Sequence, residues 1–311
     1  MVVKAGPGYH LVDYATQAYL AIVALLVWCA HGQVVPHWRG LVAAHLAGLG
    51  AIHLLVRAHA RFPALPWLDL LRYCYPVLLY TALYCETGQV NLMFAGRYLD
   101  PAFIRCEQWL FGGQPALAFM ANLPYLAVSE LFYFAYSSYY LMIVGVSAAL
   151  FLQDRRRFLH FVTVISFIFY VCYLVYIFLP VVGPQVFFER FPGYPVPPLW
   201  SVQPAPLTPN FPTALTAGPF FQLMQLLYSK FGSTGAAFPS SHVAVAVCTL
   251  CFSWRYLPRV RWVHAAAVTL LCAATVYCRY HYLIDVLAGL ATVAILLPLG
   301  NWLYRKWSDV G

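Results

Sequence analysis

Two clusters of polar residues in the C-terminal half have the residue types and spacing that catalysis requires. The first, at residues 238–242, reads Phe-Pro-Ser-Ser-His, and the second, at residues 279–285, reads Arg-Tyr-His-Tyr-Leu-Ile-Asp. His281 and Asp285 are four residues apart, which places them on one side of a helix within reach of each other. Because a carboxylate can fix the tautomer of a histidine and stabilise its cation, His281 is a candidate nucleophile. His242 could then supply the proton that a leaving alkoxide needs.

The other polar groups of the two clusters suit a phosphoryl group. Arg279 could bind a phosphate through two parallel hydrogen bonds. Ser240 and Ser241 lie at the expected start of a helix, where free N–H groups and the positive end of the helix dipole attract anions. A zinc site made of His242, His281 and Asp285 is an alternative, but the adjacent charge of Arg279 opposes a second cation. We therefore expect catalysis without a metal or other cofactor.

Two apolar runs, at residues 243–254 and 262–278, separate the clusters, so a chain that crosses a membrane twice would return both clusters to one face. The composition supports a membrane protein: of 311 residues, 62% are hydrophobic and 9% are charged, and the mean hydropathy is +0.71. We expect an all-α integral membrane fold with about eight spans. The expected spans are residues 11–30, 40–57, 70–91, 125–153, 158–180, 238–254, 262–278 and 281–304.

The net charge of +8 is explained by topology and not by a nucleic-acid partner. With eight spans, most basic residues fall on the face that also holds both termini, including residues 155–157 and Arg255, Arg259 and Arg261. Basic residues near span ends mark the cytoplasmic side. The sequence therefore predicts a multi-pass protein with cytoplasmic termini and a site that opens to the extracytoplasmic face, in the plasma or inner membrane if the source is bacterial.

The chain divides into two N-terminal helices at residues 1–69, a six-helix catalytic core at 70–304 and a short cytoplasmic tail at 305–311. Within the core, Asp100 is expected to cap an interfacial helix at residues 101–112. A long extracytoplasmic loop at 181–237 is rich in proline, so we expect no regular helix in it before an amphipathic stretch at about 218–230. A lid or acceptor-binding platform and a passive cover are equally compatible with this loop.

Two acidic residues within expected spans are candidates for lining the cavity, because an ionisable group in a membrane is costly and often functional. Glu86 lies near the extracytoplasmic end of the third span, and Glu130 lies about a turn and a half inside the fourth. For Glu130, a structural hydrogen bond to a tyrosine is the alternative. A lipid or ion transporter that uses Glu86, Glu130 and Asp285 as an ion path is a second class of function.

The two clusters resemble the second and third signature motifs of the phosphatidic acid phosphatase type 2 superfamily. Gly183-Pro184 and Phe111-Gly112 are similar to positions of its inositol phosphorylceramide synthase-like branch, and the resemblance covers roughly residues 70–297. It implies a metal-free mechanism through a phosphohistidine. In that mechanism His281 would be the nucleophile, Asp285 its orienting carboxylate, His242 the acid, and Ser240, Ser241 and Arg279 the phosphate ligands.

The first motif of that superfamily is absent, since the chain contains no Arg-Pro dipeptide. Arg190 or Lys230 in the long loop is the expected substitute for its positive charge. The function expected is cleavage of a membrane-lipid phosphoester, with transfer of the phosphoryl group or phospho-headgroup to a lipid hydroxyl or small alcohol. Hydrolysis by water is the nearest alternative, and a protein that only binds lipid is a further one.

Overall fold

The computed structural model describes residues 8–32, 34–191, 194 and 215–308, and every regular element in these residues is a helix. Extended backbone pairs among them at an isolated bridge between Val181 and Ala236. The helices are α1 (Leu11–Ala30), α2 (Trp38–Arg61), α3 (Pro66–Val90), α4 (Leu92–Ala95), α5 (Asp100–Phe111), α6 (Pro115–Asn122), α7 (Leu126–Gln153), α8 (Arg155–Phe178), α9 (Pro184–Arg190), α10 (Pro219–Phe231), α11 (Ser241–Tyr256), α12 (Arg261–Tyr277) and α13 (Leu283–Ser308).

Five of the described helices, α1, α2, α7, α8 and α13, are long and apolar enough to cross a membrane. The helices α11 and α12 have 16 and 17 residues, shorter than the roughly 20 that a full span needs, and α3 has 25 residues but carries Asp69, Arg72 and Glu86. The expected all-α multi-pass membrane fold is confirmed. Each of the eight expected spans coincides with a helix, and the crossing of the bilayer by all eight stays a prediction.

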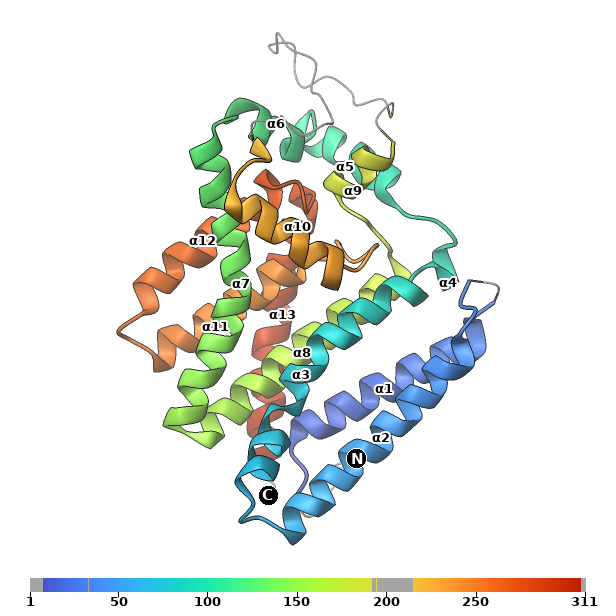
Figure 1. Ribbon diagram of the computed structural model, residues 1–311, viewed down its shortest axis with the longest axis vertical. Helices are drawn as coiled ribbons and strands as arrows, with labels where there is room; N and C mark the ends of the chain where they lie inside the picture. The colour runs from blue at the N-terminus through green and yellow to red at the C-terminus, as the bar shows by residue number, and fades with distance from the viewer. Residues whose placement is uncertain (1–7, 33, 192–193, 195–214, 309–311) are drawn as a thin grey trace.

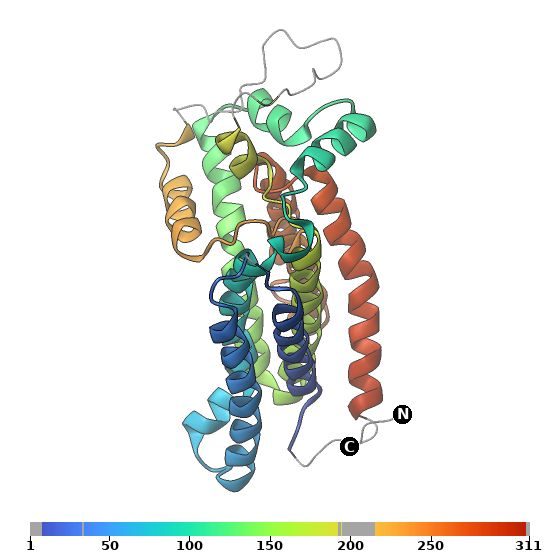
Figure 2. The same ribbon diagram turned by 90° about the vertical axis from the view of Figure 1, so that its right-hand side faces the viewer.

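The helix α8 lies at the centre of the bundle, against α1, α3, α7, α11 and α13 (Figures 1 and 2). After its basic first turn, its sequence is mostly apolar or aromatic on all sides, and a helix of that kind is stable when other helices surround it. Phe161, Ile165 and Ile168 have no exposed surface. The helices α1, α3, α7, α11 and α13 therefore pack around α8.

The N-terminal hairpin of α1 and α2 is tied to the bundle by a buried ion pair between Asp13 on α1 and Arg72 on α3. The Arg72 guanidinium donates to the two carboxylate oxygens of Asp13 at 2.8 and 2.5 Å, and the Tyr75 hydroxyl donates to one of them at 2.6 Å. Asp13 and Arg72 are 0% and 1% exposed. These bonds compensate the two charges, as burial of charged groups requires.

Four short helices, α5, α6, α9 and α10, cover the end of the bundle that lies away from the start of α1 and the end of α13 (Figure 2). The expected interfacial helix coincides with α5, but the prediction that Asp100 caps it is wrong. Asp100 is the first residue of α5, and its carboxylate accepts hydrogen bonds from the Val182 and Gly183 amides, both at 3.0 Å. These amides need a buried acceptor, so the aspartate fixes the loop after α8 instead.

The prediction of no helix in the long loop before residue 218 is also wrong, because α9 begins at Pro184. Proline is favoured in the first turn of a helix, where its missing N–H has no intrahelical role. Gly183 precedes it with φ of +88°, and any side chain there would collide with the Tyr280 carbonyl. The expected stretch at 218–230 coincides with α10, and the intervening residues 195–214 lie outside the described residues.

We predict that Asp13→Ala lowers stability by about 3–5 kcal/mol, because it leaves the buried Arg72 charge without its partner. Thermal unfolding in detergent should show a melting temperature several degrees below wild type. Arg157→Ala is the control: it removes an exposed pair with Asp154, whose atoms lie 3.5 Å apart, and should cost at most about 1 kcal/mol. Equal shifts in the two variants would contradict this account of the hairpin.

Candidate active site

The start of α11 positions His242. Ser240 is the N-cap of this helix, and its hydroxyl accepts a hydrogen bond from the Val243 amide at 3.3 Å, the interaction that makes serine a preferred N-cap. The Ser241 amide donates to the Tyr176 hydroxyl of α8 at 3.2 Å. These contacts fix the first turn of α11, on which His242 is the second residue.

The end of α12 positions His281. The Arg279 amide donates to Val276 and the Tyr280 amide donates to Thr275, at 3.0 and 3.1 Å, which is the Schellman pattern of helix termination. Arg279 occupies the left-handed position with φ of +61°. Glycine is usual there, and another residue costs about 1–2 kcal/mol. The turn directs the chain back so that Tyr280 and His281 face the start of α11.

The first turn of α13 positions Asp285. One carboxylate oxygen accepts a hydrogen bond from the Tyr282 amide at 2.9 Å, so the aspartate reaches back to the residue before the helix as in a capping box. The same oxygen lies 3.4 Å from Nδ1 of His281. The Asp285 carbonyl accepts from the Ser240 amide at 3.0 Å. Asp285 thus contacts both histidine-bearing segments.

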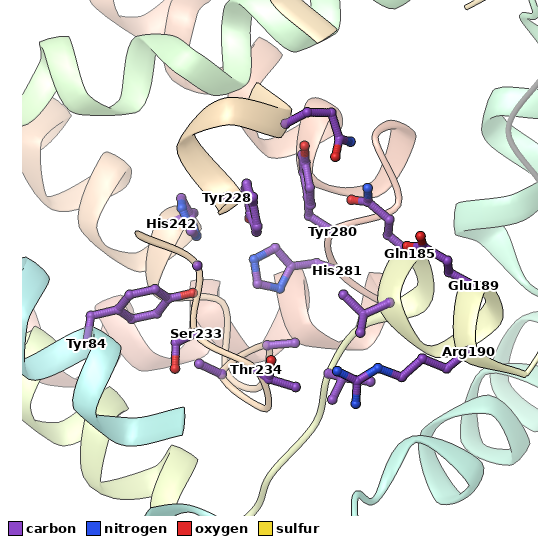
Figure 3. Close-up of a pocket in the computed structure, with 16 residues that line it drawn as sticks. Tyr84, Gln185, Glu189, Arg190, Tyr228, Ser233, Thr234, His242, Tyr280 and His281 are labelled. Atoms are coloured by element: carbon purple, nitrogen blue, oxygen red, sulfur yellow. The ribbon is translucent and has the colours of Figure 1, made fainter. Parts of the chain in front are cut away.

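The two histidines face each other, with ring centroids 5.6 Å apart. They line a cavity of about 230 Å³ between α9, the end of α10 and the loop before α11. His281 lies in the middle of this cavity, with His242 and Tyr228 to one side and Gln185 and Arg190 to the other (Figure 3). Burial lowers the pKa of His281 to about 4, so its ring is neutral at neutral pH and has a lone pair for attack.

Tyrosine side chains hold His242. Its Nε2 atom lies 3.1 Å from the Tyr136 hydroxyl, which lies 2.6 Å from the Tyr228 hydroxyl. The Tyr228 ring stacks on the Tyr280 ring with centroids 4.4 Å apart. This chain of contacts links α7, α10 and the turn after α12, so it fixes the orientation of the histidine and closes the cavity on that side.

The structure separates the expected phosphate ligands. Arg190 lines the cavity together with Gln185 and Glu189 on α9. Arg279 is 2% exposed and is not among the lining residues, although its carbonyl accepts from the Gln185 amide at 2.7 Å. Lys230 is exposed on α10 and does not line the cavity either.

Glu86 and Glu130 lie outside the cavity lining. The Glu86 carboxylate pairs with Nε2 of His45 at 3.4 Å, between α3 and α2. The Glu130 carboxylate accepts hydrogen bonds from the Phe220 and Phe221 amides at 2.7 and 3.1 Å. A carboxylate at a helix N-terminus also interacts favourably with the helix dipole, so Glu130 of α7 anchors α10.

Several lining residues were missed from the sequence. Glu189, Tyr228, Ser233 and Thr234 line the cavity, but they lie in the proline-rich loop, where no regular spacing relates them to the histidines. Tyr136 lies on α7 in a row of tyrosines, and this row is the one sequence signal that could have indicated a polar lining.

Two further carboxylates on α5 support the site from outside. Asp100 accepts from the Tyr282 hydroxyl at 3.1 Å as well as from the loop after α8, and Glu107 accepts from the Ile284 amide at 3.2 Å. Burial raises the pKa of Glu107 to about 8. Glu107 therefore holds a proton at neutral pH.

Within the described residues, no three histidine, cysteine, aspartate or glutamate side chains form a group that could hold a metal ion. His242, His281 and Asp285, the ligands of the zinc alternative, are therefore not arranged as such a group. What the geometry brings together is a neutral histidine with a carboxylate at one ring nitrogen, a second histidine opposite, and a guanidinium in one cavity. These groups suit attack on an anionic, electrophilic centre.

Comparison with known proteins agrees with this geometry. The sequence profile of the PAP2 superfamily matches residues 101–299, more than half of the chain and including both histidine clusters. A PA-phosphatase related-family protein of Dictyostelium discoideum is 38% identical over 71 residues, a stretch that covers 23% of this chain and 13% of that relative. No solved structure matches the chain.

We predict that Glu130→Ala loosens α10, because two amides at its start lose their acceptor, at a cost of about 0.5–2 kcal/mol. Hydrogen–deuterium exchange should be faster in residues 219–231 than in wild type. Ser137→Ala is the control, since the Ser137 hydroxyl bonds within α7 to the Phe134 carbonyl. Unchanged exchange in α10 of the Glu130 variant would show that this carboxylate does not anchor the helix.

Proposed function

Because the chain belongs to the PAP2 superfamily, whose membership supports a lipid phosphatase-type function, we propose that it cleaves a membrane-lipid phosphoester through a phosphohistidine at His281. One observation carries the proposal. The rings of His281 and His242 face each other in the cavity with centroids 5.6 Å apart, and Nδ1 of His281 lies 3.4 Å from a carboxylate oxygen of Asp285. A nucleophile and an acid that face each other in one small cavity are what in-line displacement at phosphorus requires.

In the first step, Nε2 of His281 attacks phosphorus, so an N–P bond forms as the bond from phosphorus to the ester oxygen breaks. The departing oxygen takes a proton from His242. The Nδ1–H group of His281 stays directed at Asp285, whose negative charge stabilises the imidazolium. Tyr136 holds His242 in place through the contact at its Nε2 atom.

In the second step, an acceptor hydroxyl attacks the phosphohistidine and gives its proton to His242, and the N–P bond breaks. An alcohol acceptor, including a lipid hydroxyl, completes a transfer, and water completes a hydrolysis. The tyrosine-rich, apolar surroundings of His242 support transfer. The Dictyostelium relative is a PA-phosphatase related-family protein, which favours hydrolysis as the second candidate.

The phosphate would lie between His281 and His242, and Arg190 would reach it from α9. Arg190 is the basic residue in the cavity lining, and its planar guanidinium can bind two phosphate oxygens at once. Arg279 would add positive potential from its buried position behind the turn. Ser240 and Ser241 would contribute the dipole of the first turn of α11.

We also propose that the site faces the extracytoplasmic side and that both termini are cytoplasmic. The basic residues 155–157 and the turn at 255–261 lie at the helix ends away from α5, α6 and α9 (Figure 1). An excess of arginine and lysine near span ends marks the cytoplasmic face. The cavity at the other end would then meet lipids of the extracytoplasmic leaflet.

We predict that His281→Ala lowers turnover of labelled phospholipids, measured in EDTA with and without a lipid alcohol, by about 10³-fold or more. Wild type given ³²P-labelled lipid should carry an acid-labile label that the variant lacks. The product shows whether water or the alcohol is the acceptor. His264→Ala is the control, because this buried histidine bonds Thr249 and Ser253 instead of lining the cavity. Equal activity in the His281 variant, or loss of activity in EDTA, would refute the mechanism.

We predict that Arg190→Ala lowers kcat/KM by about 10–100-fold, the value of a hydrogen bond between charged groups, and that Lys230→Ala changes it little. Arg190→Lys should recover part of the loss, because it restores the charge without the two-point geometry. The comparison uses initial rates on one phospholipid in mixed micelles. A larger loss in the Lys230 variant would assign the missing charge to Lys230.

A further inference from the structure

An apolar groove of about 680 Å³ lies between α7 and α12, in a part of the molecule that the proposed mechanism does not use. One wall is α7 from Ser138 to Gln153, and the other is the turn after α11 together with the first turns of α12. No residue lines both this groove and the catalytic cavity. The groove is therefore a separate space with its own chemistry.

The groove opens sideways on the flank of the bundle. Leu141 on α7 and Val263 on α12 line it and are 69% and 76% exposed. Gly145 on α7 leaves it deep, because a Cβ atom at this position would meet no neighbouring atom within 4 Å. Since α7 is long and apolar enough to cross a membrane, the open side of the groove faces lipid.

One end of the groove, at the turn after α11, is positively charged. Arg259 lines the groove and is exposed. The guanidinium carbons of Arg157 and Arg255 lie 5.1 and 5.2 Å from the ring centroid of Tyr256, which also lines the groove. No aspartate or glutamate is among the described lining residues. This end of the groove therefore attracts an anion.

The carboxylates at this end of the bundle are paired within the chain. In the part of the chain that the structure describes, they are Asp13, Asp69 and Asp154, and each forms an ion pair with an arginine of its own chain. No described carboxylate pairs with Arg255 or Arg259. A second copy of the described chain has no unpaired carboxylate to place there, so the charge favours a lipid as the anion.

We propose that this groove binds an anionic phospholipid of the leaflet opposite the catalytic cavity, with its phosphate at Arg259 and an acyl chain along α7. The proposal goes beyond the proposed function and does not depend on it. Basic pockets between membrane helices bind anionic headgroups, and each arginine or lysine near the membrane surface contributes roughly fivefold to the preference for an anionic lipid.

The length of the groove suits one leaflet. From Ser138 to Gln153, α7 rises about 22 Å, at 1.5 Å per residue. The hydrocarbon core of a bilayer is about 30 Å thick, so one leaflet contributes about 15 Å. An acyl chain with its headgroup at Arg259 can therefore lie within the groove over its whole length.

The position of the groove separates this lipid from the substrate. The turn at residues 256–261 lies at the end of the bundle away from α5, α6 and α9, which cover the catalytic end (Figure 1). The two walls nevertheless lead to the active site: α7 carries Tyr136, which contacts His242, and α12 ends at the turn before His281. A lipid in the groove would brace the two helices that position the histidines.

The test is photolabelling of the full chain in mixed micelles. The probes are phosphatidylglycerol and phosphatidylcholine that carry the same diazirine-bearing acyl chain, and peptide mass spectrometry locates the adducts. Phosphatidylglycerol should label residues 138–153 and 256–267 at least about fivefold more than phosphatidylcholine does. Arg259→Gln should lower labelling by phosphatidylglycerol about fivefold, and Gly145→Trp should lower labelling by both lipids because the ring occupies the space of the chain.

Two variants on α2 are the matched controls. Arg57→Gln removes an exposed arginine that does not line the groove, and Gly50→Trp places the same ring at an exposed glycine that also has no neighbouring atom within 4 Å of an added Cβ. Both should be labelled like wild type. Equal labelling of the groove by the two lipids, unchanged labelling in Arg259→Gln, or a groove left unlabelled because a second copy covers it would each overturn the proposal.

Discussion

The hydrogen bond from the Ser240 amide to the Asp285 carbonyl, 3.0 Å long, is the contact on which the site depends. It joins the start of α11 to the start of α13, and each start carries one half of the chemistry. Gly289 makes this approach possible, since a Cβ atom there would lie 2.6 Å from the Ser240 carbonyl oxygen. A misplacement of about 1 Å is enough to impair groups that react together. A side chain at residue 289 would push the two helix starts, and with them the two histidines, apart.

Carboxylates form the frame around that contact. Asp100, Glu107 and Glu130 each accept hydrogen bonds from backbone amides of a neighbouring segment: the loop after α8, the start of α13 and the start of α10. Buried amides need acceptors, and a carboxylate supplies them at low cost when several bonds satisfy it. The acidic residues therefore hold the walls in place, while the histidines and Arg190 remain directed at the cavity.

Local pattern was enough to predict the long helices and to select His281 and Asp285 as candidate residues. The expected spans coincide with helices because long apolar runs can satisfy their backbone only as helices in a membrane. His281 and Asp285 lie close together, but the prediction that both lie on one side of a helix is wrong, because His281 precedes α13 and meets Asp285 across the turn that caps this helix. The role of Glu130 and the exclusion of Arg279 from the cavity lining depend on contacts between segments distant in sequence. Glu130 meets α10 some 90 residues later, and no spacing rule encodes such a contact. The helix α9 was missed because proline was interpreted as a helix breaker and not as a first-turn residue.

The residues assigned to the reaction and the residues that would select a substrate differ in the same way. The groups assigned to bond making and breaking sit within two short motifs, each fixed by the capping of its own helix. The walls that would select a substrate come from α3, α9 and α10, of which α3 lies outside the family match. Under the proposed function, a change in these walls would alter which lipid is bound and leave the capped turns, with their phosphorus chemistry, undisturbed. The tyrosines of α3, α7 and α8 form part of these walls.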